Sequence, residues 1–324
     1  MSATSKGFKA REPVAHHFDS LNQRLSPIAA RDWFTARIAA REPASLIRLG
    51  DGEFAWLGYG SLAPWEQTSF ALNVWFGRDD FAPDQLAKTA SRLREAVRNA
   101  TVVGLPRGSR QMRDPFCGSV EAIFDQHDLR RPGQLFTDCG IQRFWQMLLA
   151  YRDLLADLPF LGIVTSRGIG AQIKATFRIK EVRTYPVPSE RKALGSFEDQ
   201  GPHYPQRFEQ LCEEISVPYR GAVFLVGAGA LGKIYADIIF QRGGIAIDVG
   251  SVLDGWSGIP SRGFLRQDPA VFGLECYAET AALSPDQAVA RYRTLLRTVF
   301  YSIRPTDEEM SFYSGDGESG LPVP

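Results

Sequence analysis

Along most of this chain, short apolar runs alternate with segments whose apolar residues recur at helical spacing. The predicted strands cover residues 44–49, 101–105, 134–137, 160–164, 181–187, 222–226 and 245–249. The predicted helices cover residues 31–40, 83–99, 140–158, 168–177, 208–215, 230–242 and 285–302. Because two strands that are joined through a helix usually lie parallel in one sheet, this order predicts an α/β fold. We expect a Rossmann-like, mostly parallel sheet with helices on both faces, plus a helical C-terminal extension.

The alternation fades after about residue 255, which predicts three parts. We expect an N-terminal arm and helix over residues 1–43, a Rossmann-like domain over 44–256, and a C-terminal loop, helix and polar tail over 257–324. Within the last part, residues 260–272 are expected to be a loop. The tail from Arg304 is polar, with Gly, Ser and Pro, and is expected to fray.

Charge and composition exclude several classes of protein. Lys and Arg together number 37, as do Asp and Glu, so the formal net charge of the 324 residues is zero. A nucleic-acid partner is therefore not expected, because such proteins need excess positive charge. No apolar run is long enough to cross a membrane, and residues 1–20 do not resemble a secretory signal. The four Cys form no C-x-x-C pair, so we predict reduced thiols in a cytoplasmic protein.

Two carboxylates follow the first predicted strand, in the segment Gly50-Asp51-Gly52-Glu53. Ligands of open α/β sheets bind outside the carboxyl ends of strands. On an extended segment Asp51 and Glu53 point the same way, and the two Gly allow close approach of a ligand. Such a pair is typical of an Mn²⁺ or Mg²⁺ site that bridges to phosphate oxygens. The alternative is a solvated acidic turn, and the same tripeptide recurs at 316–318 with no strand before it.

A second motif, G-x-G-x-x-G, consists of Gly227, Gly229 and Gly232, and it follows a strand and opens a helix. Asp248 comes 21 positions after Gly227, at the end of the next strand. This is the context of a dinucleotide fingerprint, so an NAD(P)-binding oxidoreductase is one hypothesis. The alternative is that these glycines only pack the helix against the strand.

A third turn carries Ser166, Arg167, Gly168 and Gly170 between a strand and a helix. Backbone N–H groups at a helix start attract anions, and Arg167 has the reach and charge to bind a phosphate. An ordinary glycine-rich turn with an exposed Arg is the alternative.

Other residues are weaker candidates. Asp138 is either a helix N-cap or a base. For His127 and His203 we predict structural roles, and Arg107, Arg110 and Arg113 are expected on a solvated face.

Taken in order, five blocks resemble the GT-D-type glycosyltransferases. The blocks are residues 46–53, 164–170, 185–189, 226–230 and 247–250. The resemblance implies a Rossmann-like sheet and a D-x-E motif that acts with a divalent metal on a nucleotide-sugar diphosphate. By position, Asp51 and Glu53 match that motif and Arg48 matches the Arg before it. Ser166 and Arg167 match the Ser-Arg of the middle turn.

The chain also departs from the family pattern, which makes it a distant relative. Ser251 stands where the family often has His, and Glu190 where it often has Asn. Ala171 and Gln172 replace the Asn-Asp that commonly closes the middle turn.

These observations lead to one main hypothesis: a metal-dependent glycosyltransferase of the hexosyltransferase class. It would move a sugar from a nucleotide-sugar, with UDP preferred, to a glycan, glycoconjugate or other hydroxyl acceptor in polysaccharide biosynthesis. The predicted catalytic residues are Asp51, Glu53 and Asp248, and the first two are the predicted metal ligands. The predicted substrate-binding residues are Arg48, Gly50, Gly52, Ser166, Arg167, Gly168, Ser189, Gly227 and Gly229.

Some choices stay open at this level. For an inverting reaction the candidate bases are Asp138, Glu190, Asp248 and Asp254. The charged loop 188–205 is either an acceptor lid or an ordinary mobile loop. Besides the oxidoreductase, a non-catalytic nucleotide-binding relative is the remaining alternative.

Overall fold

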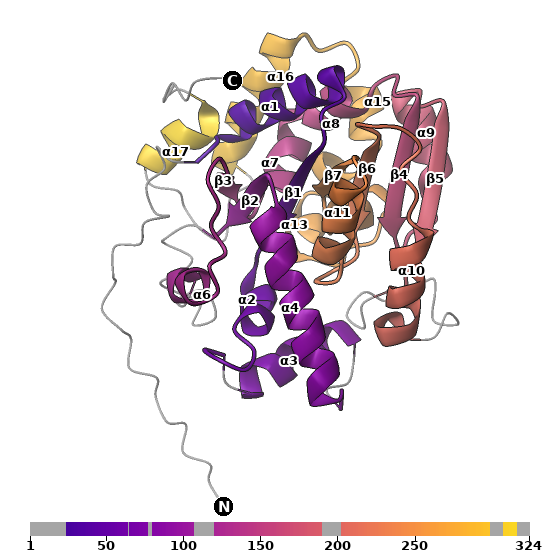
Figure 1. Ribbon diagram of the computed structural model, residues 1–324. Helices are drawn as coiled ribbons and strands as arrows, with labels where there is room; N and C mark the ends of the chain where they lie inside the picture. Colours follow the sequence, from indigo (N-terminus) through magenta and orange to yellow (C-terminus); the bar gives the residue numbers. More distant parts are fainter. Residues whose placement is uncertain are drawn as a thin grey trace, which may run out of the picture.

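The protein is built on one seven-stranded parallel sheet, seen in the computed structural model of Figure 1. The structure describes residues 24–63, 65–76, 80–106, 120–189, 202–298 and 307–315. The strands are β1 (Ala44–Arg48), β2 (Val102–Leu105), β3 (Leu135–Asp138), β4 (Phe160–Thr165), β5 (Glu181–Pro186), β6 (Val223–Gly227) and β7 (Ile245–Asp248). Their order is β3-β2-β1-β7-β6-β4-β5, and every neighbouring pair is parallel. The predicted Rossmann-like α/β fold is therefore confirmed.

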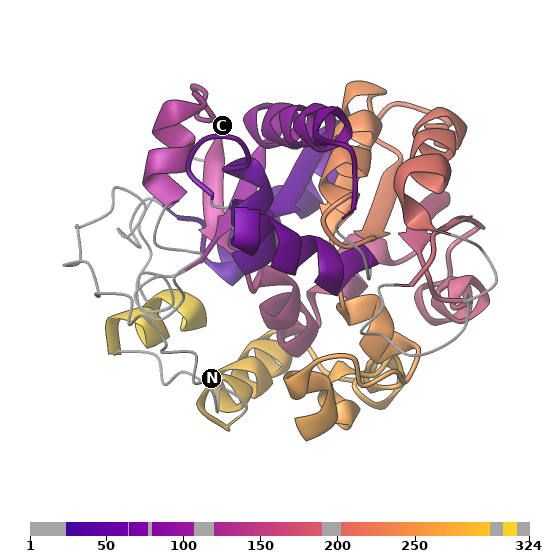
Figure 2. The same cartoon turned by 90° about the horizontal axis from the view of Figure 1, so that it is seen from below.

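Each face of the sheet has its own apolar layer. Because successive side chains of a strand point to opposite faces, Phe224 and Val226 of β6 join one cluster, whereas Val223 and Leu225 join the other. The first cluster is covered by α2 (Asp51–Leu57), α3 (Trp65–Phe76), α4 (Pro83–Asn99), α6 (Val120–Gln126), α10 (Phe208–Glu214) and α11 (Gly232–Gln241). The second is covered by α1 (Pro27–Ala40), α7 (Ile141–Leu148), α8 (Ala150–Leu155), α9 (Gly170–Phe177), α12 (Val252–Trp256), α13 (Gly263–Gln267), α14 (Pro269–Phe272), α15 (Cys276–Glu279), α16 (Pro285–Thr298) and α17 (Asp307–Ser314). Seen from below in Figure 2, the gold helices after β7 lie on the other side of the sheet from α4 and α11.

The predicted elements agree with the observed ones where the apolar pattern is regular. Helix α4 has the predicted bounds and begins at a proline, which suits the first helical position because its missing N–H has no partner there. The predicted helix over 140–158 is instead two helices, α7 and α8. They meet at Leu149, whose φ of 59° is left-handed and ends the first helix.

Two predictions about the C-terminal part are wrong. Residues 260–272 contain α13 and α14, whose Leu265 and Phe272 are buried. The described part of the tail, residues 307–315, was expected to fray but contains α17, where Tyr313 is fully buried and stacks on Phe144 with ring centroids 4.5 Å apart. The rest of the tail lies outside the described residues. Both segments are ordered by apolar contacts with residues far away in sequence, which a local pattern does not show.

The flanking parts pack on the central sheet. Helix α16 lies against α7, and α1 lies against α7, α8 and α17 (Figure 1). Residues of α1, α16 and α17 belong to the same apolar cluster as Leu46 and Ile247 of the central strands. The segments expected before residue 44 and after residue 256 thus contribute layers to one shared core.

Candidate functional site

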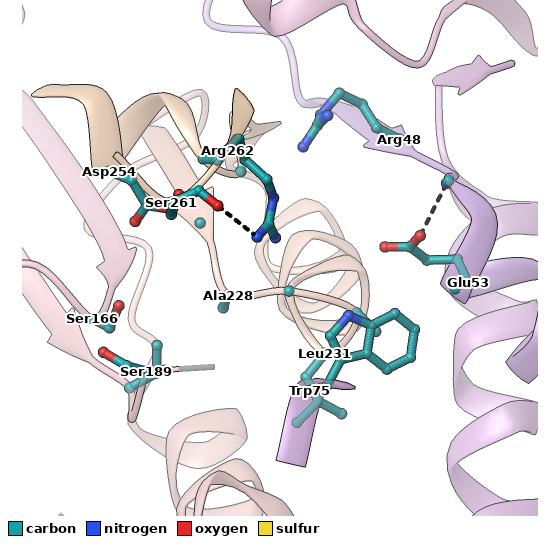
Figure 3. A pocket seen from close by; sticks show the side chains of 18 of the residues that line it. Arg48, Glu53, Trp75, Ser166, Ser189, Ala228, Leu231, Asp254, Ser261 and Arg262 are labelled. Carbon is teal, nitrogen blue, oxygen red and sulfur yellow. Dashed lines mark hydrogen bonds between the residues drawn. The ribbon is translucent and has the colours of Figure 1, made fainter. Parts of the chain in front are cut away.

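A cavity of about 530 Å³ opens at the carboxyl ends of the central strands (Figure 3). Its size is in the range of small-molecule sites. The strand order β1-β7-β6-β4 brings parts of four predicted blocks side by side: residues 48–53, 248–250, 227–232 and 166–167. Gly168, which was predicted to bind substrate, does not line the cavity. The sheet topology therefore assembles most of the predicted site residues at one place.

The D-x-E motif lies in the first turn of helix α2. Gly50 is the N-cap, and its N–H donates a hydrogen bond of 2.9 Å to Oε2 of Glu53. The expectation of an extended segment is therefore wrong. Residues two apart in a helix, at about 100° per residue, do not point the same way. The side chain of Asp51 lies outside the described part of the chain.

Glu53 belongs to a buried ion-pair cluster of four side chains: Arg48, Glu53, Lys233 and Asp248. Lys233 Nζ lies 2.9 Å from Glu53 Oε1 and 3.1 Å from Asp248 Oδ2. Arg48 Nη2 donates to Asp248 Oδ1 at 2.9 Å, and the Arg48 backbone N–H donates to Asp248 Oδ2 at 3.2 Å. None of the four side chains is more than 13% exposed. Two positive and two negative charges balance within the cluster.

The environment keeps these groups ionised. Burial alone would lower the pKa of Lys233, but the carboxylates of Asp248 and Glu53 outweigh it, and the pKa is raised. Burial alone would raise the pKa of Asp248, but Arg48 and Lys233 outweigh it, and the pKa is lowered. Asp248 does not line the cavity. Its carboxylate is therefore not presented to a ligand in the cavity, and the geometry does not support the catalytic role predicted for Asp248.

Glycine residues let the cluster pack closely. Gly250 has a φ of 48°, and a Cβ there would lie 2.2 Å from Nη2 of Arg48. A Cβ on Gly227 would lie 2.8 Å from Leu253, and one on Gly232 would lie 3.1 Å from Val226. The glycines at both ends of the G-x-G-x-x-G motif therefore pack helix and loops against the strands. With Asp248 committed to Arg48 and Lys233, no acid in this motif is placed for a ribose, which argues against the NAD(P) hypothesis.

On the other side of the cavity, Arg167 and Asp254 form a second ion pair, the Arg167–Asp254 pair. Arg167 Nε lies 2.7 Å from Asp254 Oδ1, and Arg167 Nη1 donates to Ser189 Oγ at 3.2 Å. The Ser261 hydroxyl donates to Asp254 Oδ2. Arg167 is only 2% exposed, so it is a buried partner of Asp254 rather than an exposed Arg. Ser166 and Ser189 line the cavity beside this pair (Figure 3).

The described lining is cationic, although Arg48, Lys233 and Arg167 are balanced by Asp248, Glu53 and Asp254. Six side chains carry a positive charge and two carry a negative charge. The cations are Arg48, Arg143, Arg167, Lys233, Arg262 and Arg266, and the carboxylates are Glu53 and Asp254. Figure 3 shows the Arg262 guanidinium directed into the cavity between Asp254 and Glu53. Phe70, Trp75 and Phe76 form an aromatic part of the wall. Such a cavity favours an anionic ligand with a ring to stack.

Sequence reasoning did not single out four of these cations: Arg143, Lys233, Arg262 and Arg266. For Lys233 a signal exists, because residues 227–233 read G-x-x-x-x-G-K, the spacing of phosphate-binding loops, with Ile234 where such loops have Ser or Thr. Arg262 and Arg266 lie four residues apart around the start of α13, in the segment expected to be a loop. No local pattern indicates Arg143.

Of the weaker candidates, Asp138 and His127 do not line the cavity, whereas His203 does. Asp138 accepts a hydrogen bond from the Gly140 N–H at 2.6 Å and one from the Tyr313 hydroxyl at 2.7 Å. His203 lies 2.9 Å from the Tyr235 hydroxyl, and burial lowers its pKa to about 3. His127 contacts the Ser61 hydroxyl at 3.0 Å. Arg107, Arg110, Arg113 and Glu190 lie outside the described residues.

Three further properties concern metals, thiols and membranes. Across the described ranges, no three His, Cys, Asp or Glu side chains come together as a metal site. Cys139, Cys212 and Cys276 are buried cysteines that are not in disulfide bonds, and Cys117 lies outside the described residues. Every helix within the described ranges is too short or too polar to span a bilayer.

Comparison with known proteins supports the family resemblance. Residues 29–157 match the family described as "GT-D fold-like domain". A comparison with curated proteins gave no match. Because the family match covers β1 and the D-x-E motif, it confirms a distant GT-D relative and supports a glycosyltransferase.

Solved structures similar to this chain carry related descriptions. One, described as "The highly conserved domain of unknown function 1792 has a distinct glycosyltransferase fold", is 14% identical, with 72% of this chain and 80% of that chain covered and a TM-score of 0.47. Another, described as "A New Glycosyltransferase (DUF1792) from Streptococcus sanguinis", is 17% identical, with 70% and 81% covered and a TM-score of 0.46.

Proposed function

We propose that this distant relative of the GT-D family transfers a sugar from a nucleoside diphosphate sugar to a hydroxyl acceptor. The observation that carries the proposal is the cavity at the carboxyl edge of the sheet, with its cationic wall and its aromatic wall. A diphosphate suits the first and a base or sugar ring suits the second. UDP as the nucleotide, a glycan or glycoconjugate as the acceptor, hexosyl transfer, and polysaccharide biosynthesis in the cytoplasm belong to the same proposal.

The reaction requires positive charge at the leaving group. The acceptor oxygen forms a bond to the anomeric carbon while the bond from that carbon to the diphosphate oxygen breaks. Negative charge then develops on the departing nucleoside diphosphate. Fixed cations stabilise that charge best in a partly enclosed site, where water does not screen them. Arg262 is directed into the cavity and Arg266 lines it, so these two are proposed to contact the diphosphate.

Of the three candidate bases in the described part of the chain, Asp254 has the most suitable position, and Glu190 lies outside that part. Asp254 lines the cavity and is held by Arg167 and Ser261. Asp138 and Asp248 do not line it. For an inverting transfer, we assign Asp254 to accept the proton of the acceptor hydroxyl.

The metal expected at Asp51 and Glu53, Mn²⁺ or Mg²⁺, does not fit the described half of the motif. Glu53 offers one oxygen to the Gly50 N–H and the other to the Lys233 ammonium. A cation bound at about 2–2.6 Å from Oε1 would lie within a few ångströms of the Lys233 ammonium, and the repulsion between like charges opposes its binding. We therefore assign no step of the transfer to a metal.

Binding of UDP and UDP-sugars, followed by calorimetry, tests the proposal. Arg262→Gln removes a cavity cation and should weaken binding by about 10–100-fold, the usual worth of a charge-assisted hydrogen bond. Arg220→Gln is the matched control, because Arg220 is exposed and precedes β6 at the opposite edge of the sheet. Failure of every nucleotide diphosphate and nucleotide-sugar to bind the unmodified protein would refute the proposal.

A further inference from the structure

Lys233 lies against Glu53, one of the two expected metal ligands. Its ammonium lies between the carboxylates of Glu53 and Asp248, at 2.9 and 3.1 Å. It also donates to the Gly229 carbonyl at 3.1 Å. The three protons of the ammonium thus have three acceptors, and the side chain is 5% exposed.

The oxygen atoms around the Lys233 ammonium are of the same types as the ligands of a bound divalent cation. A hard divalent ion gathers oxygen ligands from carboxylates and carbonyls, and here the same oxygen types surround a fixed ammonium. Arg48 occupies the remaining side of Asp248. A divalent ion beside Glu53 would lie only a few ångströms from this ammonium. Repulsion between like charges at that distance, in a site with little water, opposes its binding.

The glycine-rich loop gives an independent observation. Loops with the spacing G-x-x-x-x-G-K bind Mg²⁺ through a Ser or Thr hydroxyl directly after the Lys. This chain has Ile234 at that position, and the Ile234 side chain is buried in the apolar cluster. The loop therefore supplies the Lys without the hydroxyl that would hold a metal.

We propose that Lys233 is a built-in counter-ion of Glu53, one of the two expected metal ligands, and takes the place of the divalent metal there, so that the site binds its diphosphate ligand without a metal. This inference rests on the proposed function for the identity of the ligand. Lys233 acts as a positioning residue, because its protons are committed to Glu53, Asp248 and Gly229. It neutralises the carboxylates at the cavity floor, and the arginines of the lining contact the phosphates.

The first test measures Mn²⁺ binding to the full-length protein without nucleotide, from the electron paramagnetic resonance signal of free Mn²⁺. The unmodified protein should bind no stoichiometric Mn²⁺. Lys233→Met should gain one Mn²⁺ per chain, because it removes the positive charge that opposes a cation beside Glu53 and Asp248. Lys174→Met is the matched control, since Lys174 is exposed on α9, and it should behave as the unmodified protein does.

Stoichiometric Mn²⁺ binding by the unmodified protein would overturn the inference. So would a folded Lys233→Met variant that gains no Mn²⁺. If Lys233→Met does not fold, Lys233→Gln keeps a hydrogen-bonding group without the charge and should show the same gain.

The second test compares UDP binding in EDTA and in Mn²⁺. The two dissociation constants of the unmodified protein should agree within about twofold, a small difference on the scale of tenfold per 1.4 kcal/mol. Binding that disappears in EDTA would overturn the inference. If no nucleotide binds under either condition, the proposed function fails, whereas the nucleotide-free Mn²⁺ titration still decides whether Lys233 holds the place of the cation.

Discussion

The two ion-pair groups at the cavity face each other but differ in composition (Figure 3). The buried ion-pair cluster joins four charged side chains, which are between 4% and 13% exposed. The Arg167–Asp254 pair joins two charged side chains with the hydroxyls of Ser189 and Ser261, and Asp254 is 16% exposed. Removing one charge from a closed network leaves another charge buried without a partner, which is expensive. The comparison therefore assigns the first group to holding the site together and the second to contacting ligand.

The largest expected effect on stability is that of Lys233→Met. The free energy of unfolding should fall by about 3–5 kcal/mol, because Glu53 and Asp248 lose their shared cation. Urea denaturation measures it, with Lys174→Met as the control that should change by less than about 0.5 kcal/mol. Adding Glu53→Gln to Lys233→Met should recover part of the loss, because it removes the buried Glu53 charge that lost its partner, while Asp248 keeps Arg48. A single variant as stable as the unmodified protein would contradict the role given to the cluster.

Asp254→Asn should affect catalysis more than binding. Removing a general base reduces kcat by about 100–10,000-fold, while KM for the donor should change little. Steady-state kinetics with the donor identified by calorimetry provide the measurement. Asp286→Asn, at an exposed position of α16, is the control. A rise in KM with unchanged kcat would show that Asp254 binds substrate instead.

Gly250→Ala tests the close packing around Arg48. Gly243 also has a positive φ, 86°, but has open space around it, so Gly243→Ala measures backbone strain alone, about 1–2 kcal/mol. Gly250→Ala should cost about 1–3 kcal/mol more, because its Cβ would displace the Arg48 guanidinium. Thermal unfolding of the two variants gives the difference. Equal costs would show that Arg48 can move without loss.

The smallest expected effect is a loss of stability between pH 7 and pH 5, to which His203 contributes and Asp248 and Lys233 do not. Asp248 has a lowered pKa and Lys233 a raised one, so both stay charged from pH 5 to 7. His203 has a pKa lowered to about 3, below its ordinary value of about 6.5, so the unfolded chain binds the proton more readily. Its contribution is complete above pH 6.5 and declines as the pH falls, by at most about 1.4 kcal/mol per pH unit. Urea midpoints at pH 7 and pH 5 should show this decline in the unmodified protein and a smaller one in His203→Asn.

Most of the sheet was predictable because a buried parallel strand is a short apolar run. The ends of β1, β4, β6 and β7 were predicted closely, and with them the position of Arg48, Arg167 and Gly227. The order of the strands was not, and it is this order that places Asp248 beside Arg48, 200 residues away. Helix α17 was missed because its stability comes from Phe144 and Asp138 rather than from its own sequence.

The sequence by itself determined the fold class, the turns at the strand ends, and the motifs carrying Glu53, Arg167 and Gly232. Local patterns suffice there, because strand burial, helix spacing and glycine turns depend on neighbouring residues. Only the tertiary structure decided which charges meet. Glu53 was predicted as a metal ligand, yet Lys233, 180 positions later, lies against it. The physical reason is that ion pairs depend on distance in space, which the crossovers of the chain between distant strands set.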